Sequence, residues 1–250
     1  MRRTADLARE HGVRLHTHLA ETRDEDAYCQ QMYGCRPVEY LRRLGWLGPD
    51  VWLAHCVHIS EDEARLFGET GTGVAHCPSS NFRLGSGIAP IRALLAAGAP
   101  VGLGVDGSAS NDSSNMMAEA RQALLAHRSS PDTSRWITAE ESLWMATRGG
   151  ARCLGRDDIG QITPGKAADL ALIETRRLSY AGASSDILAA LVFTPFPEPA
   201  HTVMVNGRIV VEGGALVGVD VEALVARADR IAEGMLDRAE RETGRSYRTK

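Results

Sequence analysis

The sequence lacks the features that mark secreted, membrane-spanning and nucleic-acid-binding chains. Its longest apolar runs, such as ALLAAGAPVGLGV, are broken by Gly and Pro and are too short for a membrane span of roughly 20 residues. The N-terminal stretch MRRTADLAREHG is charged throughout and has no apolar signal core. No basic cluster stands out from the acidic residues around it. We therefore expect a cytoplasmic protein with no nucleic-acid partner and no membrane partner.

The sequence also has little cysteine and no CxxC spacing. The cysteines number five, which is odd, and they are Cys29, Cys35, Cys56, Cys77 and Cys153. This pattern fits a reducing compartment better than a disulfide framework. We interpret all of them as small buried hydrophobic residues.

Length and composition are those of an ordinary globular protein. The chain has 250 residues, is 44% hydrophobic and carries a formal net charge of -4 from 28 basic and 32 acidic residues. This length suits one large domain, or one domain with an appendage.

Apolar segments alternate with helical patterns over the first 155 residues or so. The expected strands are 13–19, 51–57, 72–77 and 100–107. The expected helices are 3–11, 24–33, 37–44, 61–69, 90–98, 114–127 and a last one from Thr138 to about Leu154. Ser60 with Glu63 and Thr138 with Glu141 have the spacing of capping boxes. This order predicts an α/β fold whose parallel strands are covered on both faces.

The pattern changes after Gly155. Residues 158–174 look like a turn and a strand, 179–200 are irregular, 201–216 form a hairpin that turns at Asn206-Gly207, and 221–241 form a helix capped by Asp220. We expect three domains: a partial (β/α) barrel with the metal and catalytic residues (1–157), a small β unit that is part of a composite β-sandwich (158–219), and a C-terminal helix (220–250).

The number of strands is too small for a closed barrel. An eight-stranded (β/α)8 barrel needs about 250 residues for the barrel alone. Only four strands are expected here. Either the sheet is open, or the chain is the second half of a longer one.

The stretch LHTHLAET contains two histidines on the first expected strand. Alternate residues of a strand share a face, so His16 and His18 point the same way, with His18 nearer the C-terminal end. Glu21 follows just past that end. Taken alone, the HxH pair could equally be a buried pair that is hydrogen-bonded to backbone carbonyls.

The next three expected strands end in His55, His76 and Asp106. Each has a structural alternative: a hydrogen-bonded core histidine, or an Asp that caps a turn. Together with His18 they place polar residues at the ends of four consecutive parallel strands, which is the catalytic rim of an α/β barrel. Histidine and carboxylate ligands suit one divalent metal ion, Zn²⁺ in the first place and Fe²⁺ as the alternative.

At these residues the chain resembles the amidohydrolase superfamily, in its purine and triazine deaminase branch. The resemblance rests on HTHLAET, WLAHCVHIS, HCPSSNFRLGSGIAPIRALLAAG and GVDGSASNDSSNMMAEARQ. DGSASNDSSNMMAEARQALL, ATRGGARCLGRDDIG and YAGASSD are most similar to the 8-oxoguanine deaminase group, which also carries the label hydroxydechloroatrazine ethylaminohydrolase.

The resemblance implies a role for each residue in hydrolytic deamination of an aminated ring. His18 and Asp106 would bind the metal, and Asp106 would also take a proton from the attacking water. Glu21 would move a proton between water, ring nitrogen and leaving ammonia and would contact the substrate. His55 would polarise the water or the developing oxyanion. His76 and Asn81 belong to a loop that would lie over the substrate.

The chain departs from the family pattern at its start. Members begin with a β segment and a first barrel strand that carries a metal-binding HxH pair. The only HxH here looks like that of strand five, so the resemblance implies about strands 5–8 of the barrel. We expect a fragment, or a start assigned to an internal Met, with weak or no activity on its own.

Several functions stay open at this point. The favoured substrate is a small heterocycle, 8-oxoguanine, and the alternatives are s-triazine, guanine, S-adenosylhomocysteine or pterin aminohydrolases. A hypothesis of another class is a non-catalytic half-barrel that needs a partner chain. Dimers are common among such enzymes, so a homo-oligomer is also open.

Overall fold

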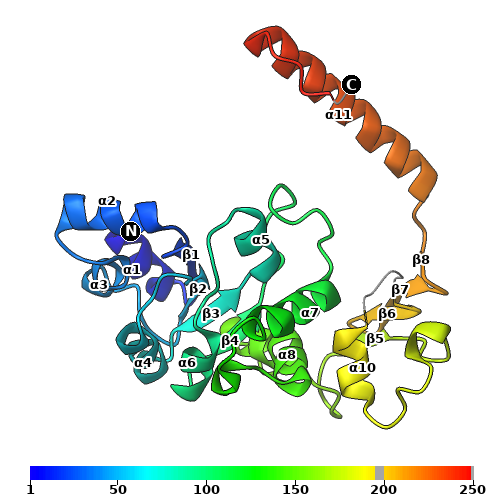
Figure 1. Ribbon diagram of the computed structural model, residues 1–250, viewed down its shortest axis with the longest axis horizontal. Helices are drawn as coiled ribbons and strands as arrows, with labels where there is room; N and C mark the ends of the chain where they lie inside the picture. The colour runs from blue at the N-terminus through cyan, green and yellow to red at the C-terminus, as the bar shows by residue number, and fades with distance from the viewer. Residues whose placement is uncertain (195–199, 249–250) are drawn as a thin grey trace. The chain divides into compact units, whose positions relative to one another are not determined.

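The computed structural model describes residues 1–194 and 200–248 (Figure 1). Residues 195–199, at the end of the stretch expected to be irregular, and residues 249–250, at the end of the expected helix domain, lie outside the described residues. The described chain forms two compact units, residues 1–169 with 175–194, and residues 170–174 with 200–248. The expected division into three functional domains stays a prediction.

A four-stranded parallel sheet forms the centre of the first unit. Its strands follow chain order and are β1 (Leu15–Leu19), β2 (Val51–His55), β3 (Gly73–His76) and β4 (Val101–Leu103). All four were predicted, and the α/β fold class is confirmed. Since the strands are parallel, their C-terminal ends lie at one edge of the sheet.

Helices connect and follow these strands. They are α1 (Arg2–Glu10), α2 (Arg23–Tyr33), α3 (Pro37–Arg43), α4 (Glu61–Thr70), α5 (Pro78–Arg83), α6 (Ile91–Ala96), α7 (Met116–His127), α8 (Ala139–Trp144), α9 (Gly150–Cys153) and α10 (Ile187–Phe193). Short 3-10 turns cover Thr133–Arg135 and Leu178–Tyr180. Both predicted capping boxes are present, at Ser60 with Glu63 and at Thr138 with Glu141. The helix expected from Thr138 to about Leu154 contains a π-helical turn, η2 (Met145–Gly149), between α8 and α9.

Two helices lie where none was expected. α5 begins directly after β3 with Pro78 at its first position, where the missing N–H leaves no bond unmade. α10 follows its N-cap residue Asp186, whose side chain accepts a hydrogen bond from the backbone N–H of Ala189. Both helices are short, with 6 and 7 residues, so their sequences carry little periodicity.

Strand β1 has one buried and one exposed face. Leu15 and Leu19 are buried in the core of the first unit, whereas His16 and His18 are exposed. The expectation that both faces of the sheet are covered is therefore wrong for β1. The alternation of apolar and polar residues in LHTHL is that of a half-buried strand.

Glycines allow the last helical segment to lie directly against β4. A Cβ added at Gly149 would overlap the carbonyl oxygen of Val101 and would lie 2.9 Å from the ring of Trp144. A Cβ added at Gly102 would lie 2.8 Å from the Cα of Gly150. Backbone meets backbone at this interface, and a side chain at either position would separate η2 and α9 from the strand.

The second unit contains a four-stranded antiparallel sheet of β5 (Leu170–Leu172), β6 (Thr202–Val205), β7 (Arg208–Glu212) and β8 (Ala215–Leu216). The predicted hairpin is confirmed, and Asn206 and Gly207 turn with φ of 47° and 78°. Positive φ at both positions is the conformation that an Asn-Gly turn favours.

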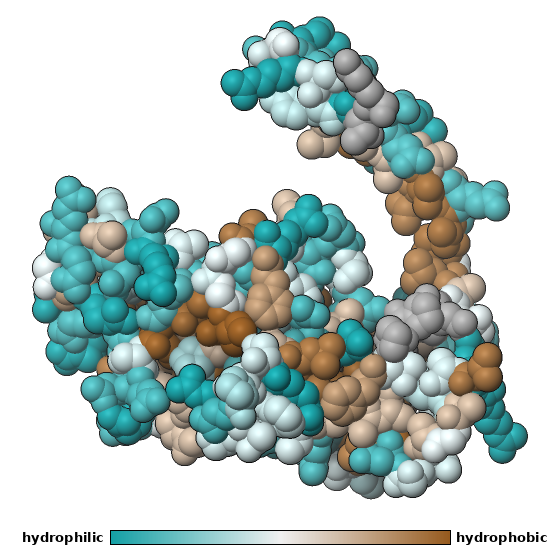
Figure 2. Space-filling view, in the orientation of Figure 1, coloured by the Kyte–Doolittle hydropathy of each residue, from teal (hydrophilic) through white to brown (hydrophobic). Residues whose placement is uncertain are grey.

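A long C-terminal helix, α11 (Val221–Thr243), also belongs to the second unit. Apolar side chains along it are exposed: Val221, Leu224, Val225, Ile231 and Met235 (Figure 2). Charged residues such as Arg227, Asp229, Arg230 and Glu233 are exposed between them. Within the described residues no helix is long and apolar enough to cross a membrane.

Candidate active site

His18 lies on the exposed face of β1, one layer nearer the C-terminal end than His16. His16 stacks on Trp52 of β2 with ring centroids 3.6 Å apart, and its Nδ1 lies 3.2 Å from the Trp52 carbonyl oxygen. Burial against that ring lowers the pKa of His16. His16 is thus held by β2, while the ring of His18 is free to face the end of the strand.

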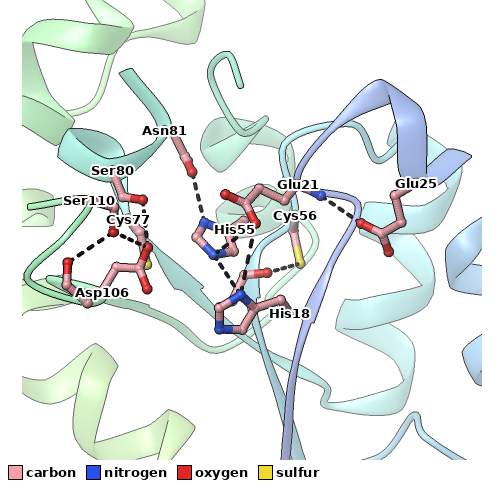
Figure 3. Close-up of polar contacts among 12 residues, drawn as sticks. His18, Glu21, Glu25, His55, Cys56, Cys77, Ser80, Asn81, Asp106 and Ser110 are labelled. Carbon is pink, nitrogen blue, oxygen red and sulfur yellow. Dashed lines mark hydrogen bonds and ion pairs between the residues drawn. The ribbon is translucent and has the colours of Figure 1, made fainter. Parts of the chain in front are cut away.

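His55 reaches the same face as His18 only because its backbone is left-handed. In the parallel register His18 pairs with Ala54, and His55 pairs with Leu19, whose side chain is in the core on the opposite face. His55 has a φ of 69°, which reverses the alternation and turns its imidazole toward His18. The His55 Nε2 lies 3.2 Å from the His18 Nδ1 (Figure 3). Such a conformation costs about 1–3 kcal/mol in a residue other than glycine and is concentrated at functional sites.

Glu21 follows β1 through another left-handed residue, Ala20, with a φ of 48°. The Glu21 backbone N–H donates a hydrogen bond of 3.0 Å to Oε2 of Glu25, which fixes the turn into α2. Its own Oε2 lies 3.6 Å from the His55 Nε2 and 3.9 Å from the His18 Nδ1. The carboxylate therefore returns over the strand ends, as Figure 3 shows.

His18, Glu21 and His55 form one cluster of donor atoms. One nitrogen or oxygen from each lies within 4.8 Å of the others. Two imidazole nitrogens and a carboxylate oxygen are ligands that Zn²⁺ commonly takes in proteins. We call these residues the donor cluster.

Asn81 sets the orientation of His55 from behind. The Nδ1–H of His55 donates a hydrogen bond of 2.9 Å to Oδ1 of Asn81, and both residues are fully buried. Because an amide oxygen only accepts, this bond places the His55 proton on Nδ1 and leaves the Nε2 lone pair directed at the donor cluster. Asn81 supports His55 through this bond, and the expected contact of Asn81 with the substrate stays a prediction.

Asp106 lies just beyond β4, also in a left-handed conformation, with a φ of 62°. Its Oδ2 accepts hydrogen bonds from the hydroxyl groups of Ser80 at 2.6 Å and Ser110 at 2.8 Å. Burial acts to raise the pKa of Asp106, but these donors and the Gly107 backbone outweigh it and hold the pKa below its usual value. Asp106 is not one of the three residues of the donor cluster. Ser80 and Ser110 were not predicted, because nothing in their sequence context distinguishes them from other loop serines.

His76 lies on the other side of the sheet. Ala75 pairs with Ala54, so by alternation His76 and Val74 point to the face that carries the apolar core. His76 is 1% exposed, and its ring lies 5.8 Å from that of His127 on α7. Burial lowers the pKa of His76 to about 3. β3 lacks the left-handed residue that redirects His55, and the role of His76 over the substrate stays a prediction.

The fold and the donor cluster agree with a comparison to known families. The sequence model of the Amidohydrolase family matches residues 1–210. This chain belongs to that family.

Curated relatives include several ring deaminases. The chain is 54% identical over 236 residues to an 8-oxoguanine deaminase from Pseudomonas aeruginosa, covering 94% of this chain and 52% of the relative. It is 39% identical over 230 residues to hydroxydechloroatrazine ethylaminohydrolase from Pseudomonas sp. (strain ADP), covering 91% of this chain and 47% of the relative. The chain thus spans about half the length of the curated relatives it matches. The resemblance to the purine and triazine deaminase branch is confirmed.

Solved structures show the same fold. An adenosine deaminase from Xanthomonas campestris with bound zinc superimposes with a TM-score of 0.89 at 33% identity, covering 93% of this chain and 53% of that chain. An atrazine chlorohydrolase from Arthrobacter aurescens complexed with zinc gives a TM-score of 0.86 at 39% identity, covering 90% of this chain and 50% of that chain.

Proposed function

We propose that this chain is part of a metal-dependent hydrolytic deaminase that acts on an aminated purine-like ring, with 8-oxoguanine as the favoured substrate. The observation that carries the proposal is the donor cluster, in which two histidines and a glutamate from β1 and β2 meet at the C-terminal ends of parallel strands. The 54% identity to an 8-oxoguanine deaminase supports the choice of ring.

The residues present fit a divalent metal ion. The Nε2 lone pair of His55 faces the His18 Nδ1 at 3.2 Å, and the ring of His18 is exposed. The carboxylate of Asp106, whose lowered pKa keeps it ionised at neutral pH, adds an oxygen ligand. We propose His18 and Asp106 as ligands, with Zn²⁺ favoured and Fe²⁺ as the alternative. When bound, such a metal supplies Lewis acidity that lowers the pKa of a water molecule to about 7.

The reaction forms a bond between water oxygen and a ring carbon and breaks the bond from that carbon to its amino group. Glu21 takes one proton from the attacking water and delivers it to the ring nitrogen. His55 polarises the water, because its Nε2 accepts a hydrogen bond while Asn81 holds the proton on Nδ1. Asp106 takes the second proton, which leaves with the amino group as ammonia.

The test measures zinc binding and ammonia release with 8-oxoguanine by the full-length protein that contains this chain, because the 250-residue chain alone is expected to be weakly active or inactive. Glu21→Gln is expected to keep zinc binding and to lower turnover by about 10²–10⁴-fold, since it removes the proton carrier. Glu10→Gln, an exposed residue at the end of α1, is the matched control and should behave as wild type. A full-length protein that binds no zinc and releases no ammonia would overturn the proposal, as would equal turnover by E21Q and wild type.

A second candidate substrate is an s-triazine ring, favoured by the likeness to hydroxydechloroatrazine ethylaminohydrolase. The same assay with a hydroxy-s-triazine separates the two rings by the ratio of kcat/KM values. A stable oligomer that shows neither zinc binding nor turnover would instead support a non-catalytic half-barrel with a partner chain. A homo-oligomer stays a prediction.

A further inference from the structure

The buried carboxylate of Glu119 lies outside the donor cluster. Glu119 is on the first turns of α7 and is 0% exposed. Within the described parts of the chain, no basic side chain forms an ion pair with it. Burial raises the pKa of Glu119, although hydrogen bonds from Ser79 and Asn111 act to lower it. A buried, unpaired carboxylate is costly to a fold, and it persists where it holds something in place.

Each oxygen of Glu119 accepts a hydrogen bond, and the donors come from two segments, the first turn of α5 and the loop after β4. Its Oε2 accepts from the backbone N–H of Ser79 at 3.2 Å, in the segment that follows β3. Its Oε1 accepts from the side-chain amide of Asn111 at 2.7 Å, in the segment that follows β4. Asn111 is itself 5% exposed, so both bonds to Glu119 are shielded from water.

Both segments carry residues of the proposed active site. Ser79 precedes Ser80, which donates to Asp106, and Asn81, which accepts from His55. In the loop after β4, the residue before Asn111 is Ser110, which also donates to Asp106. Each partner of Glu119 is therefore the chain neighbour of a serine that holds the Asp106 carboxylate.

We infer that Glu119 is a positioning residue that clamps the first turn of α5 to the loop after β4, so that Asn81 meets His55 and the two serines meet Asp106. The inference rests on the proposed function, because it assigns a purpose to the geometry of that site. Glu119 itself is not proposed to contact the substrate.

A carboxylate is the group that this position requires. Both partners donate, and an ionised carboxylate offers two acceptor oxygens and no donor. Glutamine has nearly the same shape but one of its two polar atoms donates, so one partner would face a donor. Asn111 cannot correct this by turning its amide without losing another bond, since its Oδ1 accepts from the Ser113 hydroxyl at 3.1 Å.

The experiment compares wild type with Glu119→Gln in the full 250-residue chain without substrate. Two signals are read by NMR: hydrogen exchange of the Ser79 amide, and the ¹⁵N shifts of the His55 ring, which report the proton on Nδ1. We expect exchange at Ser79 to be about tenfold faster in E119Q and the Nδ1–H form of His55 to lose its dominance. The control is Ser142→Ala, which removes a buried hydrogen bond from α8 to the Ala120 carbonyl on α7. This change leaves the hydrogen bonds of Glu119 to Ser79 and Asn111 in place.

A rescue variant makes the test specific. In E119Q combined with Asn111→Asp, the glutamine amide can donate to the new carboxylate while its oxygen accepts from Ser79, so both bonds return with the charge moved. Wild-type signals in the double variant support the inference, and they do so even if E119Q alone fails to fold. It is overturned if E119Q matches wild type, if S142A changes the His55 shifts as much, or if the double variant stays perturbed or unfolded. None of these readouts uses turnover or metal, so their failure is separate from failure of the proposed function.

Discussion

Replacing Asn81 by Ala tests how the site controls the proton on His55. The substitution removes the only acceptor that the described residues offer to the buried Nδ1–H. An unmade bond of this kind costs about 1–3 kcal/mol of unfolding free energy. The imidazole can avoid that cost by moving its proton to Nε2, where Glu21 Oε2 lies 3.6 Å away. The Nε2 lone pair is then lost to the donor cluster.

Either outcome weakens zinc binding. The Nε2 of His55 lies 3.2 Å from the Nδ1 of the proposed ligand His18. Loss of such support behind a metal ligand lowers affinity by about 10–100-fold, and we expect N81A to fall in that range. The assay is competition for Zn²⁺ against a chromophoric chelator at neutral pH, with urea unfolding of the metal-free chain alongside it. Asn81→Asp is the control, since it keeps an acceptor beside His55 and should bind zinc within about threefold of wild type.

An N81A chain that binds zinc as tightly as wild type and is equally stable in urea would refute this prediction. Equal loss of zinc affinity in N81A and N81D would also contradict it, because the acceptor would then not be the property that counts.

Three further predictions concern stability. Gly149→Ala should lower the unfolding free energy by about 1–3 kcal/mol, because its Cβ overlaps β4. Gly234→Ala on α11, where an added Cβ would have no neighbour closer than 4.0 Å, should raise it by about 0.5–1 kcal/mol. Urea unfolding of the two variants checks that the two changes in unfolding free energy have opposite signs. Burial lowers the pKa of His76 to about 3 and that of His127 to about 4, so below pH 6.5 these histidines take up protons in the unfolded chain before they do so in the folded chain. The unfolding free energy should therefore fall between about pH 6.5 and 4 by up to 1.4 kcal/mol per pH unit for each histidine. His127→Gln should make this slope smaller, and an unchanged slope would contradict a lowered pKa for His127. Removal of zinc by a chelator should lower the unfolding free energy by about 2.7 kcal/mol relative to zinc at a hundred times Kd, and identical melting curves would show that the folded chain does not bind it.

Much of the fold could be predicted because it depends on local patterns. The four strands are short apolar runs between helices with recognisable caps, and the Asn206-Gly207 turn has the one dipeptide that most favours its geometry. The short helix α5 could not be predicted this way, because Pro78 and the serines after it are also typical of a loop.

The site was harder to predict than the strands that carry it. Sequence position places His18, His55 and His76 at the ends of neighbouring strands, but not on a face. Left-handed backbone turns His55 into the donor cluster, while His76 keeps the regular alternation and is buried on the other side. The difference is a single φ angle, and no residue type marks it, since glycine is absent from both positions.

The supporting residues escaped prediction for another reason. Glu119 sits in NMMAEARQ, where a glutamate in an amphipathic helix is most simply read as exposed. Its burial depends on partners in α5 and in the loop after β4, which are 40 and 8 positions away in the chain. Contacts of that kind are set by tertiary packing alone.

The glycine interface at β4 has a consequence for how variation in this chain is interpreted. A saturation scan scored on survival would find Gly102 and Gly149 nearly as intolerant as His18 or Asp106, though neither glycine has any chemistry to offer. At the two glycines, every larger residue should be rejected, alanine included. At Asp106 it should depend on the chemical nature of the replacement. The set of replacements that each position tolerates, and not the severity of the loss, would therefore separate residues needed for packing from residues that act on a substrate.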